Sequence, residues 1–448
     1  MLAGRALREC AARSSHSAWN APPGRDPLAI VENTCCGRVA SLIPLRNARM
    51  AVSPFAFYRG GADIMAADLS GTPVTGLNVQ LSGDAHCLNF GAFATAERRL
   101  LFDVNDFDET APGPWEWDLK RLAVSLALAA RSIKLKDSGA TVAVTAAVRS
   151  YRTKMHDYAT ATALQNWYTR IDAASVVLET NGDDRRRQRQ IAESAHAHSM
   201  RAAIEKITFS TNGVRTFRED PPSVYHPTDE EHNDLAIERV LASYLESVSP
   251  EVRVLLDRYK LVYHAIKVVG VGSVGTRCSV ALLQADHDDV LILQIKQAVA
   301  SVLERYTAKG AYANHGERVV RGQRLMQRAS DGLLGWGTSG QHDFYVRQYS
   351  DKKGAVDITA LDGYGLREYA HMCGWTLARA HARSGDPAQI AGYLGKGDTF
   401  DKALLRFAII YADQVEQDYA LFRAAIDAGK IPLPPGPAAK GTALSSAR

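Results

Sequence analysis

The stretch YHAIKVVGVGSVGTRCSVALLQADHDDVLILQIKQA, residues 263–298, decides the fold of this chain. It contains three apolar runs rich in β-branched residues, YHAIKVVG, TRCSVALL and DVLILQIKQA, and these predict three strands. The glycine-rich segment Gly270–Gly275 separates the first two runs. A later run, DFYVRQYS at 343–350, and a helical pattern over Glu317–Arg328 complete a small sheet-based lobe over residues 262–350.

The glycine-rich segment has the pattern G-x-G-x-x-G, formed by Gly270, Gly272 and Gly275. In a dinucleotide-binding fold these glycines close a strand and open a helix, whereas the run that follows here reads as a strand. We therefore expect the glycines, with Ser273, at the tip of a β-hairpin. Such a tip can fold over phosphates and offer its N–H groups, because no Cβ stands in the way. An ordinary glycine-rich turn is the alternative.

A single lysine, Lys296, interrupts the apolar strand LILQIKQA. A lysine is costly to bury unless it meets an anion or a carboxylate, so we expect it to bind one. In the alternative, its ammonium group reaches water at the sheet edge. Glu317, at the start of the predicted helix, is the candidate carboxylate partner and Glu304 is its rival. Glu317 also suits a purely structural role in the first turn of a helix.

Two further motifs carry acidic side chains, GDAHCLN at residues 83–89 and FDVNDFDET at residues 102–110. Asp84 and Asn89 lie five positions apart, and acids follow the next predicted strand. In this pattern one acid handles a hydroxyl proton, while the asparagine and a second acid hold a hard cation such as Mg²⁺. In the alternative, Asp84 and Asn89 are turn residues and the later acids form a solvated loop.

Helical periodicity dominates the rest of the chain. Short strands are predicted at Asn78–Leu81 and Arg99–Val104, and helices at Trp117–Ser132, Ala140–Thr160, Arg187–Lys206, Asp234–Lys260, Tyr364–Arg383 and Thr399–Ala428. This order predicts five parts: a flexible N-terminal extension over 1–45, a helical lobe with the acidic motifs over 46–261, the sheet lobe over 262–350, helices that complete the helical lobe over 351–430, and a flexible tail over 431–448.

The composition of the 448 residues, 46% of them hydrophobic, is that of a globular protein with an ample core. A net charge of +4 argues against a nucleic-acid partner, and the longest apolar run, Leu122–Ala130, is too short to cross a bilayer. The six cysteines form no C-x-x-C pair, so we expect neither a zinc site nor a disulfide framework. A cytoplasmic location fits best, with a transit peptide as a minor alternative.

Together these motifs resemble those of protein-kinase-like phosphotransferases, and their wording is closest to aminoglycoside and choline kinases. GDAHCLN is similar to the catalytic-loop phrase H-G-D-x-H-x-x-N, with Ser82 in place of the first histidine, and VNDFDE is similar to the acidic phrase that follows it. GPWEWDLKRLA resembles the G-x-P and D-L-A segment of those enzymes. GWTLARAHARSG, residues 374–385, resembles the L-A-x-x-H helix that precedes their catalytic loop.

The order of these parts is rotated, because ordinary kinases have the glycine loop and lysine before the catalytic loop. Cutting such a chain between the L-A-x-x-H helix and the catalytic loop, and joining its old ends through the helical middle, gives the order found here. The resemblance therefore implies an α+β, protein-kinase-like bilobal fold in circularly permuted form, with a small antiparallel β lobe and a large helical lobe.

At the level of the whole chain, the wording is similar to the bacterial domain of unknown function 2252 family (DUF2252), from about Leu45 to Tyr419. The blocks that carry this resemblance are SPFAFYRGGADIMAADL, GDAHCLNFGAF, NDFDETAPGPWEWDLKRLA, GERVVRGQRLMQ and FYVRQYSDKKG. That family implies no activity, so the functional expectation rests on the kinase-like motifs. Arg59, in FYRG, is a candidate anion ligand, with a buried structural ion pair as the alternative.

The kinase-like resemblance implies an ATP-dependent transfer of a phosphoryl group to a hydroxyl of a small molecule, with ATP and Mg²⁺ as cofactors. Asp84, as the base or hydroxyl-positioning acid, and His86 are the candidate catalytic residues. Asn89 and Asp106 are the candidate metal ligands, with Asp103 as the rival of Asp106. The candidate nucleotide-binding residues are Gly270, Gly272, Ser273, Gly275, Lys296 and Glu317. The alternative function is that of a non-catalytic, pseudokinase-like nucleotide-binding regulator. The sequence leaves the acceptor and the oligomeric state open.

Overall fold

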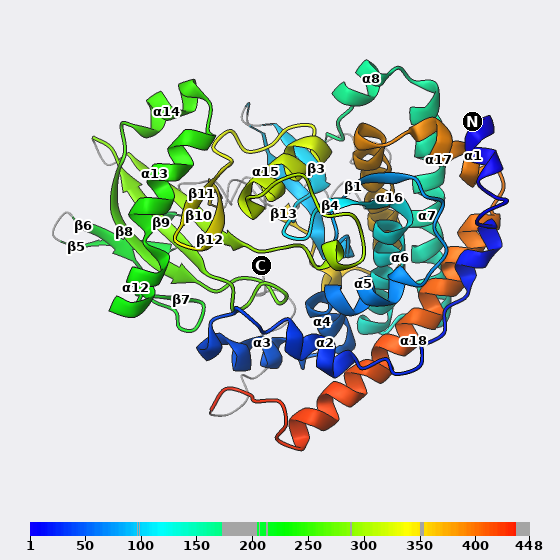
Figure 1. Ribbon diagram of the computed structural model, residues 1–448, viewed down its shortest axis with the longest axis horizontal. Coiled ribbons are helices and arrows are strands. Elements are labelled where there is room, and N and C mark those ends of the chain that lie inside the picture. Colours follow the sequence, from blue (N-terminus) through cyan, green and yellow to red (C-terminus); the bar gives the residue numbers. More distant parts are fainter. Residues whose placement is uncertain are drawn as a thin grey trace.

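The computed structural model describes residues 1–95, 97, 99–172, 204–205, 207–211, 214–286, 289–349 and 354–435. It has a mixed α+β fold, with a sheet lobe on the left of Figure 1 and a helical lobe on the right. The predicted helix Arg187–Lys206 lies outside the described residues except for 204–205, and so does the predicted tail beyond residue 435. Among the described residues, no helix is long and apolar enough to cross a membrane.

The sheet lobe is built on six antiparallel strands in the order β11-β12-β10-β9-β8-β7. The four predicted strands of this lobe are confirmed as β8 (Lys260–Lys267), β9 (Cys278–Gln284), β10 (Val290–Ala298) and β12 (His342–Gln348). The strands β7 (Val224–Tyr225) and β11 (Gly335–Ser339) were not predicted. The run GWGTS lacks a strand pattern because its glycines allow the strand to pack closely on a neighbouring helix. A Cβ on Gly337 would lie 2.5 Å from the Val240 carbonyl oxygen of that helix.

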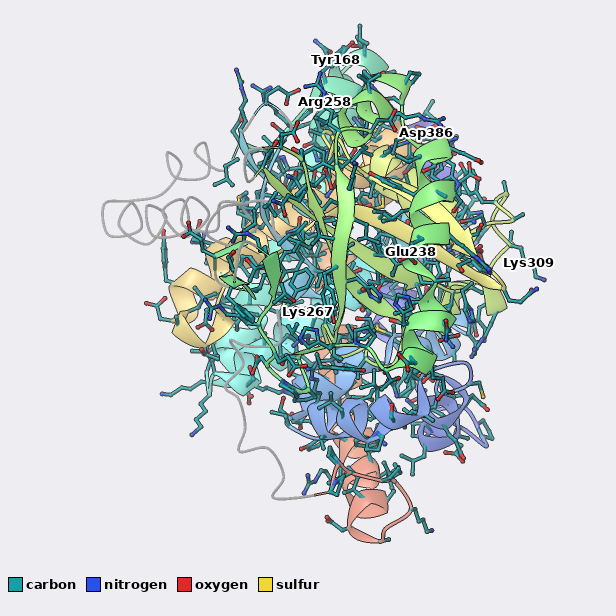
Figure 2. The ribbon with its side chains drawn as sticks, turned by 90° about the vertical axis from the view of Figure 1, so that its left-hand side faces the viewer. Tyr168, Glu238, Arg258, Lys267, Lys309 and Asp386 are labelled. Atoms are coloured by element: carbon teal, nitrogen blue, oxygen red, sulfur yellow. The ribbon has the colours of Figure 1, made fainter. Side chains whose placement is uncertain are left out.

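The two faces of this sheet have different partners. Ile295, Leu293 and their neighbours pack against three helices, α12 (Asp229–Leu235), α13 (Ile237–Ser247) and α14 (Pro250–Leu256). Figure 2 shows this lobe from its outer side, with Glu238 of α13 and Lys267 at the end of β8 labelled. Because side chains alternate along a strand, Lys296 points to the opposite face, where α15 (His315–Met326) packs on β12. The predicted helix at 317–328 is thereby confirmed, two residues earlier.

The helical lobe is formed mainly by α6 (Trp115–Ser132), α7 (Asp137–Thr160), α16 (Gly363–Ser384) and α18 (Thr399–Asp427). All four were predicted, with bounds that shift by at most three residues. The shorter α17 (Pro387–Leu394) follows α16 directly and packs against α7. These helices share one large core with α4 (Pro54–Gly60) and α5 (Ala62–Ser70).

The tight contact between α16 and α7 gives a testable expectation. A Cβ on Gly374 of α16 would lie 2.1 Å from the Ala147 carbonyl oxygen, so the two backbones must separate in Gly374→Ala. We expect a loss of about 1–3 kcal/mol in the free energy of unfolding, measured by urea denaturation. Gly363→Ala, in the same helix with nothing closer than 3.9 Å, is the matched control and should be neutral. Equal effects of the two substitutions would contradict this packing.

The first 45 residues differ from the flexible extension that we expect from their composition. They contain α1 (Leu2–Ala6), a 3₁₀ turn at Arg13–Ser17 and α2 (Pro27–Asn33), and α3 (Ile43–Met50) follows. This segment packs along α17 and α18, where the buried His16 bonds the Tyr393 hydroxyl through Nε2 (2.7 Å). In Figure 1, α2 and α3 run below the junction of the two lobes. The contacts that hold this segment are scattered along it, and polar side chains such as His16 make some of them. No periodic apolar pattern therefore marks the segment in the sequence.

Short strands hold the two acidic motifs in place. β1 (Asn78–Leu81) pairs with β4 (Ala111–Pro114), and β2 (Phe90–Ala94) pairs with β3 (Leu100–Val104) and β13 (Gly354–Ala355). The GDAHCLN turn therefore lies between β1 and β2, and the acids of NDFDE follow β3. The predicted strands at 78–81 and 99–104 are confirmed. The remaining described elements are α8 (Ala163–Tyr168), β5 (Thr208–Thr211), β6 (Val214–Phe217) and 3₁₀ turns at 40–42, 87–89, 302–305 and 358–360.

Candidate functional site

The two lobes meet where Lys296 of β10 contacts Asp108, which is 188 residues away in the chain. The Lys296 ammonium donates to Asp108 Oδ2, and the Tyr345 hydroxyl donates to Asp108 Oδ1 (2.8 Å). Tyr345 is the cross-strand neighbour of Lys296 on β12. Burial alone lowers the pKa of Lys296, but the Asp108 carboxylate outweighs it and raises that pKa well above its usual value. Lys296 is therefore a buried, charged lysine that faces the acidic loop.

The prediction that Glu317 pairs with Lys296 is wrong, because Lys296 pairs with Asp108 in this structure. Glu317 lies in the first turn of α15, where its backbone N–H donates to the capping side chain of Asn314 (2.9 Å) and its carboxylate accepts from Arg321 Nε (3.2 Å). Its rival Glu304 lies in the 3₁₀ turn at 302–305, close to Gly310. Lys296 instead pairs with Asp108, because the loop after β3 reaches the sheet from the helical lobe. The sequence signal that could have indicated this pairing is Asp108, the second acid of the D-F-D phrase.

The GDAHCLN turn is anchored by Asp118 at the start of α6. The Asp118 carboxylate accepts from the backbone N–H groups of Ser82 (2.7 Å) and Gly83 (3.0 Å), and His381 Nε2 of α16 lies 3.2 Å from it. Gly83 has a φ of +84°, and a Cβ there would lie 2.0 Å from the Glu109 carbonyl oxygen. The D-L-A and L-A-x-x-H wording that the sequence singled out thus corresponds to two side chains that hold this turn.

Within the turn, Asp84 is paired with an arginine that sequence reasoning missed. Arg121 of α6 donates to Asp84 Oδ1 from Nε (2.8 Å), and its Nη2 lies 2.7 Å from the same oxygen in an ion pair. Burial raises the pKa of Asp84, and Arg121 opposes this shift. His86 Nε2 lies 3.7 Å from Asp84 Oδ2, and burial, with the nearby Arg59 and Arg121, holds the pKa of His86 well below 6.5. His86 is therefore a neutral imidazole beside a carboxylate that Arg121 orients.

The candidate metal ligands differ in their surroundings. Asn89 Nδ2 donates to the Asp84 carbonyl oxygen (2.8 Å), and the Asn89 carbonyl accepts from Asn105 N–H (2.8 Å), which brings the loop after β3 against the turn. Asp106 follows on that loop and accepts from the Asp108 N–H (3.2 Å). Asp103, the rival, is 2% exposed and forms an ion pair with Arg379 of α16. Asp103 is thus committed to the core, which leaves Asp106.

The oxygen donors present suit a hard cation such as Mg²⁺. An amide oxygen of Asn89 and the carboxylates of Asp106 and Asp108 are the ligand types that Mg²⁺ prefers, completed by water and phosphate oxygens. Burial, and after it the neighbouring Asp108 charge, raise the pKa of Asp106. Within the described ranges, no group of three or more His, Cys, Asp or Glu side chains is suited to hold a metal. A cation here would therefore depend on a phosphate ligand.

The glycine segment connects β8 and β9, so the predicted hairpin tip is confirmed. Gly270 and Gly275 have φ values of +68° and +91°. Two arginines of the N-terminal segment hold the tip: Arg49 donates to the Gly270 carbonyl (2.7 Å) and Arg38 to the Val274 carbonyl (2.7 Å). In addition, Ser273 Oγ bonds the Val269 carbonyl (3.1 Å) inside the loop. None of the sequence motifs indicated these two contacts between the N-terminal part of the chain and the glycine loop.

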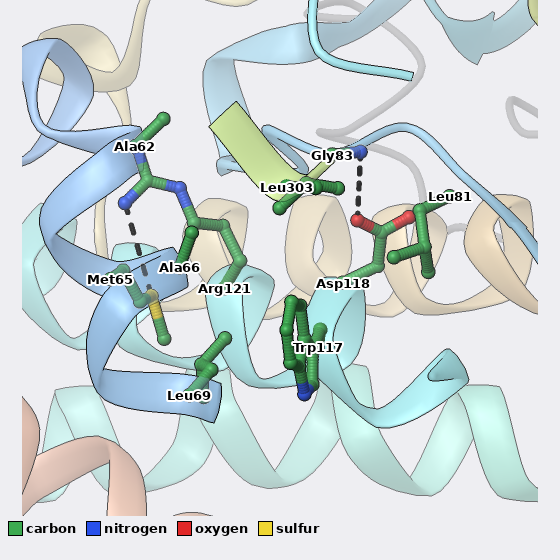
Figure 3. A pocket seen from close by; sticks show the side chains of 10 residues that line it. All are labelled: Ala62, Met65, Ala66, Leu69, Leu81, Gly83, Trp117, Asp118, Arg121 and Leu303. Carbon is green, nitrogen blue, oxygen red and sulfur yellow. Dashed lines mark hydrogen bonds between the residues drawn. The ribbon is translucent and has the colours of Figure 1, made fainter. Parts of the chain in front are cut away.

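A small pocket with a volume of about 10 Å³, room for about one water molecule, adjoins the GDAHCLN turn. Figure 3 shows Arg121 and Asp118 projecting from α6 toward it, with Gly83 above. Apolar side chains form the rest of its wall, namely Ala62, Met65, Ala66, Leu69, Leu81, Trp117 and Leu303. The pocket thus combines an apolar wall with the groups that position Asp84.

Glu109, next to this site, gives a pH prediction. Its Oε2 accepts from the Val302 N–H (2.8 Å), and burial raises its pKa to about 7. Because the folded state keeps this proton between pH 4.5 and 7 while the unfolded state releases it, the free energy of unfolding should fall as pH rises through that window. In Glu109→Gln the fall in the free energy of unfolding from pH 5 to pH 8, measured by urea denaturation at both pH values, should be smaller by about 2 kcal/mol. Parallel profiles for parent and variant would refute it.

Comparisons with known proteins bear on identity. A family model described as "Uncharacterized protein conserved in bacteria (DUF2252)" matches residues 38–425, a range that includes both acidic motifs, the glycine loop and Lys296. No curated protein and no solved structure matches this chain. The resemblance to the bacterial family is thereby confirmed, while the kinase-like resemblance receives no support from these comparisons.

Proposed function

Because this chain belongs to the DUF2252 family, whose description names no activity, we propose its function from the site: ATP-dependent transfer of a phosphoryl group to a hydroxyl of a small molecule. One observation carries this proposal. The buried Lys296 of the sheet lobe meets Asp108 on the loop that lies against the GDAHCLN turn. A charged lysine, a pair of acids and the Asp84–Asn89 turn are thus together, and this is the set that phosphoryl transfer from a nucleotide requires.

The strand order supports a protein-kinase-like arrangement of the sheet lobe. A glycine-rich hairpin between β8 and β9, a lysine on the next strand β10 and a helix before the last two strands follow the order of parts in kinases. In space the five strands run β8-β9-β10-β12-β11, all antiparallel. The N–H groups around Gly272 would then cover the phosphates, and Lys296 would bind the α- and β-phosphates once the nucleotide separates it from Asp108.

The end of α16 supports the circular permutation. The Gln80 N–H of β1 donates to Ser384 Oγ (2.9 Å), although the two residues are 304 positions apart. A Cβ on Gly385 would lie 2.5 Å from Val79 Cγ1, so the chain leaves α16 directly beside the strand that enters the GDAHCLN turn. The two sides of the proposed cut therefore lie close enough for a short connection to have joined them in the unpermuted order, as circular permutation requires.

In the proposed reaction the bond from the γ-phosphorus to the bridging oxygen of ATP breaks and a bond to the acceptor oxygen forms. The acceptor's proton passes to Asp84, and ADP leaves. Arg121 holds the Asp84 carboxylate in one orientation and weakens it as a base, which suits a loose transition state in which positioning matters more than proton removal. Asn89 and Asp106 would hold Mg²⁺, which neutralises phosphate charge, and the neutral His86 is within reach of Asp84. A cytoplasmic location remains part of this proposal.

The Arg121–Asp84 and Lys296–Asp108 pairs also favour a second candidate, a non-catalytic nucleotide-binding regulator. Both groups that an enzyme needs free are paired in this structure. A titration of the melting temperature with ATP, with and without Mg²⁺, separates the candidates. A Mg²⁺-dependent rise with ADP formation in the presence of hydroxyl acceptors supports the enzyme. A metal-independent rise without product supports the regulator, and no rise contradicts both.

A further inference from the structure

Arg59 is the charged side chain near the site that the proposed reaction leaves without a role. It lies in the last turn of α4, and its Nε is buried with no hydrogen-bond partner. In the described part of the chain its guanidinium forms no ion pair within 4.0 Å. Three other arginines of this region have partners, because Arg121 pairs with Asp84, Arg46 donates to the Gly60 carbonyl (3.0 Å) and Arg49 donates to the Gly270 carbonyl.

Both acids and arginines lie near Arg59, yet none of the described carboxylates is within ion-pair distance of it. Burial lowers the pKa of Arg59, and Asp84 and Asp106 act in the opposite direction, so both acids lie within electrostatic reach. A buried structural arginine is normally satisfied by a carboxylate or by backbone carbonyls at hydrogen-bond distance. Arg46 and Arg318 also have a buried Nε without a partner, but other hydrogen bonds hold their side chains. Among the described residues no hydrogen bond holds the Arg59 side chain, and this points to a ligand that supplies oxygen atoms.

The position of α4 says where that ligand would lie. A Cβ on Gly272 would lie 3.3 Å from the Arg59 carbonyl oxygen, so the tip of the glycine loop rests on the last turn of α4. The same turn is tied to the catalytic side, because Arg121 Nη2 donates to the Tyr58 carbonyl (2.9 Å) while the same side chain pairs with Asp84. Arg59 therefore stands between the loop that would cover phosphates and the acid that would position the acceptor.

We infer that Arg59 binds the terminal phosphoryl group of the nucleotide, so that the site selects a triphosphate over a diphosphate. This inference rests on the proposed function and adds a ligand for the oxygens of the transferred group. A planar guanidinium suits this task, because it offers several N–H donors to one phosphate and keeps its charge when buried. Neither Asp84 nor Asp106 lies within ion-pair distance of Arg59, so its guanidinium keeps its donors for a phosphate.

The test compares binding of three probes by calorimetry in the presence of Mg²⁺: ATP, ADP and inorganic tripolyphosphate. The parent should bind ATP and tripolyphosphate more tightly than ADP. Arg59→Gln should weaken ATP and tripolyphosphate by about 10- to 100-fold, the range for a charged hydrogen bond, and leave ADP within about twofold. Arg59→Lys keeps the charge, is the variant to use if the glutamine variant does not fold, and should fall in between.

Two controls separate this role from a structural one. Arg49→Gln loses a bond to the glycine loop and should weaken ATP and ADP alike, because the whole loop shifts. Arg131→Gln removes a surface pair with Asp413 and Glu416 in the helical lobe and should change nothing.

The outcomes distinguish this inference from the proposed function. Equal losses for ATP and ADP in Arg59→Gln, or no loss, overturn the inference while nucleotide binding by the parent still supports the function. Binding of tripolyphosphate without either nucleotide overturns both the inference and the proposed function, even if Arg59→Gln abolishes that binding. Binding of none of the three probes overturns both.

Discussion

Replacing Asp84 with asparagine is expected to lower phosphoryl transfer by about 10²- to 10⁴-fold while nucleotide affinity stays within a few fold. The substitution keeps the shape of the side chain and one oxygen acceptor for Arg121, but removes the charge that, in the proposed reaction, would position the acceptor hydroxyl and take its proton. In that proposal the nucleotide contacts would come from the glycine loop and Lys296 on the other lobe. The measurement is turnover of ATP with the acceptor that a hydroxyl-compound screen identifies, together with ATP affinity by calorimetry.

The control for this variant is Asp413→Asn, which removes a carboxylate that pairs with Arg131 on the surface. It should leave turnover unchanged. Far-ultraviolet circular dichroism and the melting temperature show whether Asp84→Asn still folds, since Arg121 loses its charged partner. A folded Asp84→Asn protein with parental turnover would remove Asp84 from the mechanism and favour the regulator.

The largest expected loss of stability follows from Arg25, in the segment that precedes α2. Its guanidinium donates to Asp68 of α5 from Nε (2.8 Å) and to Asp418 of α18 from Nη2 (2.6 Å), and all three side chains are at most 6% exposed. Arg25→Ala leaves two buried carboxylates without a cation. We expect a loss of about 3–5 kcal/mol in the free energy of unfolding.

The matched control is Arg131→Ala, which breaks the pairs with Asp413 and Glu416, where the Arg131 side chain is 25% exposed and its partners about half exposed. Its cost should stay within about 1 kcal/mol, because water and salt screen surface pairs. Urea denaturation of both variants makes the comparison. If Arg25→Ala cost no more than Arg131→Ala, the N-terminal segment would contribute nothing through this triad to the fold.

Periodic patterns predicted most of the fold. The sheet lobe and the long helices appear where alternation or helical spacing is strong, since these patterns record which face of an element is buried. The misses have physical causes. The strand β11 consists of glycines and small residues that allow close packing on α13, and the N-terminal segment is held by dispersed side chains such as His16 and Arg25, which leave no periodic trace in the sequence.

The candidate site was predicted in its composition more than in its pairings. The structure brings Lys296 to the acidic loop. It also joins Asn89 to the backbone of Asp84, which is the kind of local bond that the alternative of two turn residues predicts. In the structure, however, the partner of Lys296 is Asp108 and not Glu317. Spacing along one chain cannot rank acids on different loops, because the ranking depends on where the two lobes dock.

What this sequence determined by itself was the set of parts: a glycine hairpin, a strand lysine, a GDAHCLN turn with acids after the next strand, and the helices that carry Asp118 and His381. Local patterns suffice for these, since each is built from residues close together in the chain. Only the tertiary structure decided which charges meet: Arg121 pairs with Asp84, Arg379 pairs with Asp103, and the Arg59 Nε is buried without a hydrogen-bond partner. Such choices depend on packing between segments hundreds of residues apart, where burial makes an unpaired charge costly and so selects one partner among several.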